Sequence, residues 1–119
     1  MISTAEDLNA FHRALRSGRL LKPEILAEMV SFLDTPADQM RFVKPNGSAG
    51  YSLGYERQQK TSLGITLEGH SGGVPGSLSF MFYWVEGEAF ISYNVNTTDT
   101  AAQNIMLRLI DAIKCGSSA

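Results

Sequence analysis

Apolar residues near the start of the chain recur at the spacing of an α-helix. Three of them fall at i, i+3 and i+7, on one helical face: Leu8, Phe11 and Leu15. Ser3 and Glu6 have the spacing of a capping box, and Gly18 stands where a C′ glycine ends a helix. The pattern predicts a helix over residues 4–17 with Ser3 as its N-cap.

Two further helices are predicted from similar patterns. Pro23 suits the first position of a short second helix. Its apolar stripe consists of Ile25, Leu26, Met29 and Val30. Near the end of the chain, residues 100–103 have the form of another capping box, and an amphipathic helix follows. Its apolar face consists of Ile105, Met106, Leu109, Ile110 and Ile113.

Between these helices the pattern changes to that of strands. Apolar residues alternate over 51–55 and 63–67, and the polar residues 57–60 between them are predicted to form a hairpin loop. Residues 78–85 are apolar on both faces, as expected of a central, covered strand, and 89–95 form the return strand.

The region before the strands, residues 31–50, carries two prolines and two glycines and is predicted to be a long irregular connection. The element order is therefore two helices, four strands and one helix. This order predicts an α+β fold, in which two N-terminal helices and one C-terminal helix pack on an antiparallel sheet of about four strands.

Composition narrows the functional classes. With 119 residues the chain suffices for a single domain, 1–119. The net charge of −2 gives no electrostatic footprint for a nucleic acid or an anionic membrane, and the longest apolar stretch is too short to span a bilayer. The lone Cys115 excludes an internal disulfide, and it is expected to be an accessible spare thiol. His12 is expected to be a surface or boundary residue and not a ligand, because nothing nearby completes a metal site.

The segment 68–77, EGHSGGVPGS, is the strongest candidate for chemistry. Glycine weakens a strand, so four glycines before the most apolar strand suggest close approach of another backbone or of a ligand. His70 and Ser71 add a titratable group and a hydroxyl to unobstructed backbone N–H groups, which are the parts of an oxyanion-binding site. A plain glycine-rich turn between two strands explains the same composition.

Three separated stretches together resemble the C-terminal third of the serine β-lactamase-like hydrolases, the group of class C β-lactamases, D-alanyl-D-alanine carboxypeptidases and esterases. They are MISTAEDL at 1–8, YSLGYE at 51–56 and GHSGGVPG at 69–76. The resemblance implies a partial β-lactamase/transpeptidase-like fold, with residues 1–119 as the C-terminal portion of such a hydrolase. It implies no metal or organic cofactor.

The resemblance also implies roles for four consecutive residues. His70 stands for the basic member of the family's Lys/His-Ser/Thr-Gly motif, which assists proton movement. Ser71 would hydrogen-bond the acyl side or the carboxylate of a substrate. Gly72 would keep the strand flat so that substrate lies as an added strand, and the Gly73 N–H would bind the oxyanion.

The chain departs from the family pattern at the nucleophile. The residues three positions before its four lysines are Arg19, Arg41, Arg57 and Asp111, so no Ser-x-x-Lys motif is present. The family's Tyr-x-Asn motif is absent as well. We therefore expect His70 and Ser71 to act in supporting roles only, with no hydrolysis by this chain alone.

Two hypotheses follow. In the first, the chain contributes to an acyl-transfer site on an ester or amide, such as a β-lactam or a D-Ala peptide, that an N-terminal catalytic portion completes. In the second, it is a non-catalytic domain that binds peptides or associates with a second copy of itself, including a homodimer with swapped elements. The sequence is compatible with the bacterial periplasm and with the cytoplasm.

Overall fold

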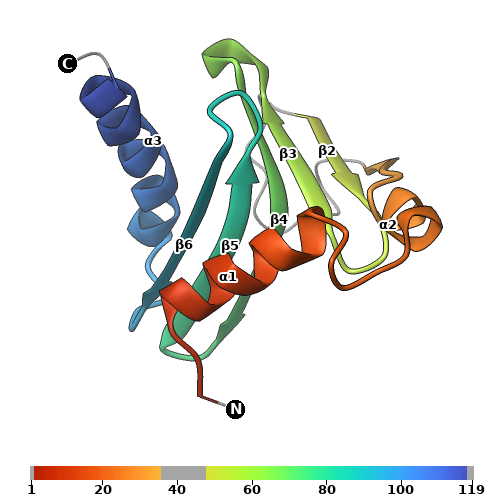
Figure 1. Ribbon diagram of the computed structural model, residues 1–119. Coiled ribbons are helices and arrows are strands. Elements are labelled where there is room, and N and C mark those ends of the chain that lie inside the picture. The colour runs from red at the N-terminus through yellow and green to blue at the C-terminus, as the bar shows by residue number, and fades with distance from the viewer. Residues whose placement is uncertain (1, 36–47, 118–119) are drawn as a thin grey trace.

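The computed structural model describes residues 2–35 and 48–117, which form an α+β domain (Figure 1). The helices are α1 (Ala5–Arg16), α2 (Pro23–Met29) and α3 (Asn104–Ser117). The strands are β1 (Leu33–Thr35), β2 (Ser48–Tyr51), β3 (Glu56–Lys60), β4 (Ile65–Val74), β5 (Ser77–Trp84) and β6 (Ala89–Val95). Short 3-10 turns lie at Thr61–Leu63 and Thr100–Gln103. The predicted fold class and three helices are confirmed.

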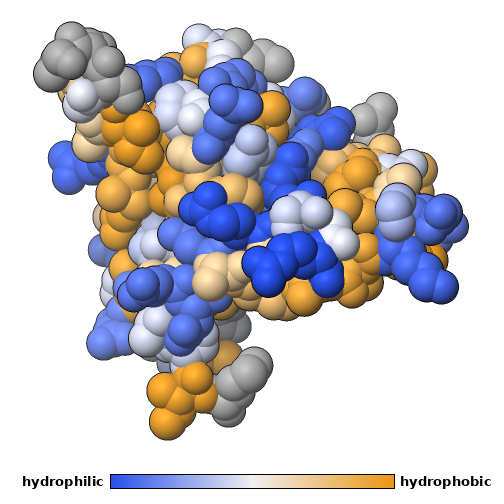
Figure 2. All heavy atoms as spheres, viewed as in Figure 1, coloured by the Kyte–Doolittle hydropathy of each residue, from blue (hydrophilic) through white to orange (hydrophobic). Residues whose placement is uncertain are grey.

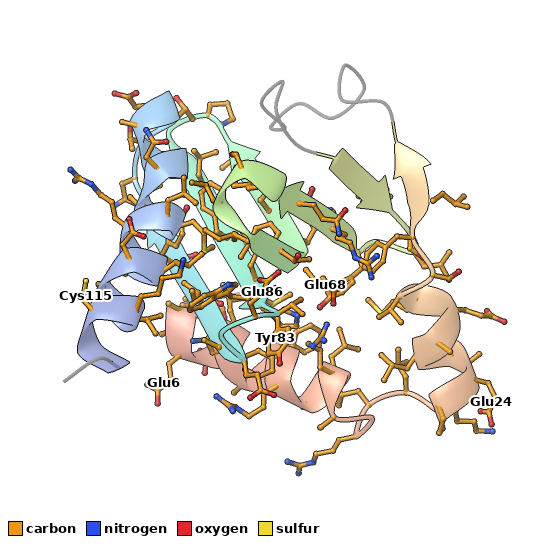
Figure 3. All side chains as sticks on the ribbon, turned by 90° about the horizontal axis from the view of Figure 1, so that it is seen from above. Glu6, Glu24, Glu68, Tyr83, Glu86 and Cys115 are labelled. Atoms are coloured by element: carbon orange, nitrogen blue, oxygen red, sulfur yellow. The ribbon has the colours of Figure 1, made fainter. Side chains whose placement is uncertain are left out.

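The strands form one antiparallel sheet in sequence order, from β1 at one edge to β6 at the other. Helices α1 and α3 pack on opposite faces of this sheet (Figures 1 and 3). On the α3 face, alternate residues of β5 such as Phe82 and Trp84 are buried in a core with Met106 and Ile110. On the α1 face, the Arg16 guanidinium lies 4.0 Å from the ring centre of Tyr83. The apolar stretch 78–85 thus forms an interior strand, as predicted.

The described residues form six strands where about four were predicted, and the polar hairpin loop at 57–60 was wrong. These residues lie in β3, and the turn precedes them: the Ser52 N–H donates to the Tyr55 carbonyl at 2.9 Å. Strand β3 consists of polar residues that can bind polar partners, as Arg57 binds Glu68. It therefore lacks the apolar alternation by which a strand is recognised in a sequence. Of the predicted connection 31–50, the described ends belong to β1 and β2, and 36–47 lie outside the described residues.

The ends of the helices follow the predicted chemistry with shifts of one residue. Thr4, not Ser3, is the N-cap of α1, because its hydroxyl accepts from the Asp7 N–H while the Asp7 carboxylate accepts from the Thr4 N–H. Gly18 ends the helix with a φ of +75°, as predicted. At the other end of the chain, Asp99 rather than Thr100 caps the turn before α3.

A buried polar network joins α1 to the sheet. His12 is fully buried, so the expectation of a surface or boundary position was wrong. Its Nε2 forms a hydrogen bond with the Tyr55 hydroxyl. The Glu68 carboxylate accepts from Arg16 at 2.6 Å and from Arg57 at 3.0 Å. Figure 3 shows Glu68 on the side of the sheet that faces α1. Burial, reinforced by the charge of Arg16 and opposed by Glu68, lowers the pKa of His12 to about 4.

Gly69 marks a close approach between β4 and β5. A Cβ on Gly69 would lie 2.0 Å from the Met81 carbonyl oxygen, and backbone cannot move aside as a flexible side chain can. A Cβ on Gly72, three residues later in the same strand, would meet nothing within 4 Å. Gly69 is therefore required by the packing of β4 against β5, whereas the packing within the domain does not require a glycine at position 72.

We expect Gly69→Ala to destabilise the protein by at least about 3 kcal/mol, because the β4–β5 ladder must open around the new methyl group. Gly72→Ala is the matched control and should change the free energy of unfolding by less than about 1 kcal/mol. Urea denaturation followed by circular dichroism measures both. Equal stabilities of the two variants would contradict the close packing at Gly69.

Protonation of His12 should make the fold sensitive to acid. Because the folded-state pKa lies below the unfolded value of about 6.5, stability is full above pH 6.5 and is lost as the pH falls toward 4. Between pH 7.5 and 4.5 the loss from this group amounts to about 2 to 3 kcal/mol. Denaturation of the wild type and of His12→Gln at both pH values separates the contribution of His12 from that of the other titrating groups. The same pH dependence in both proteins would contradict the assignment.

Candidate functional site

Strand β4 extends beyond its neighbour β3. The β3–β4 pairing ends at Glu56 opposite Gly69, whereas β4 continues for five residues that pair with β5 alone. In the part of the chain that the structure describes, no strand covers the other edge of residues 70–74. We call these five residues the free edge. All four candidate residues from the sequence lie on it, next to one another.

His70 is exposed at the start of the free edge. Its Nε2 forms a hydrogen bond of 3.0 Å with the hydroxyl of Tyr51, the last residue of β2, and the two rings meet edge to face. The imidazole is thus accessible and has a phenol beside it. The sequence placed Tyr51 in an alternating strand and in the stretch YSLGYE, but it gave Tyr51 no role in the site, because a contact across 19 positions leaves no local signal.

Ser71 points toward a buried carboxylate that sequence analysis did not select. Its hydroxyl donates to Glu56 Oε1 at 3.2 Å, and Glu56 is only 5 % exposed. Burial raises the pKa of Glu56, while the charge of His70 and hydrogen bonds from Ser71 and Gln58 partly offset this rise. The one available signal was a charged residue directly after the alternating segment 51–55.

Gly72 and Gly73 continue the free edge with bare backbone. The space beside Gly72 is open, whereas a Cβ at Gly73 would lie 2.5 Å from Leu78 Cδ2, a side-chain atom. Both residues are exposed. A flat stretch of main chain without side chains lets a second extended chain approach closely. Neither glycine has a positive φ, so the backbone conformation does not require glycine at these positions. The arrangement is suited to binding the backbone of another chain.

A small hollow lies beside Ser71 on the α3 side of the sheet. Its volume is about 60 Å³, and its lining includes Gln58, Lys60, Phe80 and Asn104. Ligand pockets usually enclose roughly 300 to 1,000 Å³. The hollow is therefore too small to hold a substrate.

The described residues contain neither of two other kinds of feature. Residues 2–35 and 48–117 hold no group of three or more His, Cys, Asp or Glu residues that could bind a metal ion. Among the helices of these ranges, none combines the length and the apolar character needed to cross a bilayer. Cys115 is exposed on α3 (Figure 3).

Comparisons with known proteins agree with this fold. Residues 1–113 match the family model described as beta-lactamase. Among solved structures, a D-stereospecific amidohydrolase from Streptomyces sp. is 35 % identical in sequence over 77 % of this chain, with a TM-score of 0.60. The chain spans 25 % of the length of that amidohydrolase. Because the family match covers nearly the whole sequence, this chain belongs to the β-lactamase family.

Proposed function

We propose that the chain is the C-terminal portion of a serine hydrolase of this family and forms one wall of its acyl-transfer site. The observation that carries the proposal is the free edge of β4, which presents His70, Ser71 and two bare glycines in consecutive positions. The similarity to a D-stereospecific amidohydrolase supports an amide among the substrates.

In this proposal, an extended substrate adds to the free edge as a further strand. Its main chain would exchange hydrogen bonds with those backbone groups of residues 70–74 that point away from β5, while the bare Gly72 leaves room for it. The Gly73 N–H would stabilise the oxyanion that forms as the carbonyl is attacked. His70, beside Tyr51, would help to move the proton to the leaving amine or alcohol.

The nucleophile must come from outside this chain. A serine supplied by an N-terminal portion would attack the carbonyl carbon, form an acyl-enzyme and release the protonated amine or alcohol. Water would then hydrolyse the acyl-enzyme to the acid and regenerate the serine. Neither Ser-x-x-Lys nor Tyr-x-Asn occurs in the 119 residues, so the chain alone lacks the groups that activate a serine.

We expect no covalent adduct when the purified chain is treated with a fluorophosphonate. The Ser71 hydroxyl donates to Glu56, and a carboxylate is a much weaker base than the histidine or lysine that usually activates a serine, while His70 is hydrogen-bonded to Tyr51. Intact-mass spectrometry measures the adduct, with a known serine hydrolase as positive control. A stoichiometric adduct that disappears in Ser71→Ala would show that Ser71 is a nucleophile and would overturn the supporting role.

A second candidate function rests on the exposed apolar residues around α2 and the first strands. Leu33 is 75 % exposed and Leu53 is 66 % exposed, and about half of Leu20 is accessible. Figure 2 shows apolar side chains gathered around α2 and the adjoining end of α1. Such surfaces are usually covered by a partner. The proposed partner is the N-terminal catalytic portion, or a second copy of this chain in a non-catalytic, self-associating or peptide-binding domain.

Without another partner, this apolar surface should drive self-association at high concentration. We expect sedimentation equilibrium to show a concentration-dependent dimer that Leu53→Lys weakens about tenfold or more. Ile113→Lys on α3, away from this surface, is the matched control. A chain that stays monomeric at millimolar concentration would exclude the second copy and leave the N-terminal portion as the proposed partner.

A further inference from the structure

Glu56 is a buried carboxylate directly behind the free edge. It begins β3, lies opposite Gly69 in the β3–β4 register and opposite Tyr51 in the β2–β3 register. Ser71 is two residues beyond Gly69, and its side chain therefore projects from the same face of β4 as that position. The Ser71 hydroxyl reaches Glu56 Oε1 at 3.2 Å.

The direction of this hydrogen bond determines what Ser71 can offer to a ligand. A serine hydroxyl has one hydrogen and two acceptor lone pairs, whereas an ionised carboxylate can only accept. Since Glu56 takes the hydrogen, the Ser71 oxygen presents only lone pairs elsewhere. A ligand group that faces Ser71 must then donate, as an amide N–H or an ammonium does. A carboxylate there would meet an acceptor oxygen with the Glu56 charge behind it.

The other charged groups around Glu56 do not reverse the direction of this hydrogen bond. His70 on β4 is the charged group that acts on Glu56 through space, and Ser71 and Gln58 supply hydrogen bonds to it. Arg57, the next residue in β3, alternates to the other face of the sheet and is bound to Glu68. The neighbouring arginine is therefore engaged elsewhere.

We propose that Glu56 is a positioning residue that holds the Ser71 hydroxyl as an acceptor toward the ligand, so that the free edge favours a substrate N–H or ammonium group over a carboxylate. The inference rests on the proposed function in one respect, namely that the free edge is a substrate wall. Of the two expected partners of Ser71, the proposal favours an N–H on the acyl side of a substrate over the carboxylate.

The link between the two side chains is tested by titrating the Glu56 carboxyl carbon in the full chain by ¹³C NMR. Removal of the hydroxyl in Ser71→Ala should raise the midpoint by about one pH unit, a tenfold change in proton affinity, because the ionised form loses one of its hydrogen-bond donors. Ser71→Thr keeps a hydroxyl and should restore the midpoint. Ser79→Ala is the control, because the Ser79 hydroxyl donates to Asn94 on the same sheet. Equal midpoints in wild type and Ser71→Ala would overturn the proposal.

The preference for a donor is tested with acetamide and sodium acetate as probes, at equal concentration and constant pH. In the wild type, acetamide should shift the backbone amide signals of residues 71–73 more than acetate does. In Glu56→Gln the new amide can donate to the Ser71 oxygen and free the Ser71 hydroxyl to donate to a ligand. The ratio of the shift caused by acetate to the shift caused by acetamide should therefore rise about fivefold. Equal shifts by both probes, or none by either, would overturn the preference.

The two proposals can fail separately. Neither NMR experiment requires a nucleophile, so the loss of the Ser71–Glu56 link would leave the acyl-transfer role of the free edge standing. A fluorophosphonate adduct on Ser71 would instead overturn that role, whatever the titration of Glu56 shows.

Discussion

The Glu68 carboxylate, shared between Arg16 on α1 and Arg57 on β3, is the contact on which the geometry of this domain depends. Each of its oxygens accepts from a different guanidinium, so one side chain fixes a helix and a neighbouring strand on β4 at once. Charge-assisted hydrogen bonds of this kind are stronger than neutral ones and demand defined directions. The Tyr55 hydroxyl, which Arg16 and His12 both contact, extends the network into the interior.

This anchor lies two residues before His70 in the same strand. Strand β4 therefore passes from a part held on both sides, by β3 and β5, to a part held by β5 alone. The close approach at Gly69 marks the transition, and Ser71 returns a hydrogen bond to the first residue of β3. The part of β4 that leads into the free edge is thus held by strands on both sides, and the proposed substrate wall needs a support of this kind.

Much of the fold follows from local pattern, because helices α1 and α3 and strands β5 and β6 each bury one periodic face. Strand β3 does not, since its partners are polar and its register depends on β2 and β4. His12 shows the same limit: a histidine on an amphipathic helix was expected at the surface, and its burial depends on Tyr55, 43 positions away. Within the candidate site, His70 to Gly73 could be found because they are contiguous in a motif. Tyr51 and Glu56 join them only through the tertiary fold, so no spacing in the sequence predicted their roles.

The bare main chain at Gly72 has a consequence for the kind of discrimination such a surface can exert. The repeating amide unit is common to all peptides, so a strand edge without side chains recognises that unit and remains indifferent to the residues attached to it. It fixes direction and register, and it leaves the choice among side chains and their handedness to whatever surface lies opposite. A wall of this kind can serve unchanged in enzymes of different selectivity, because diversification can proceed entirely on the other side of the cleft.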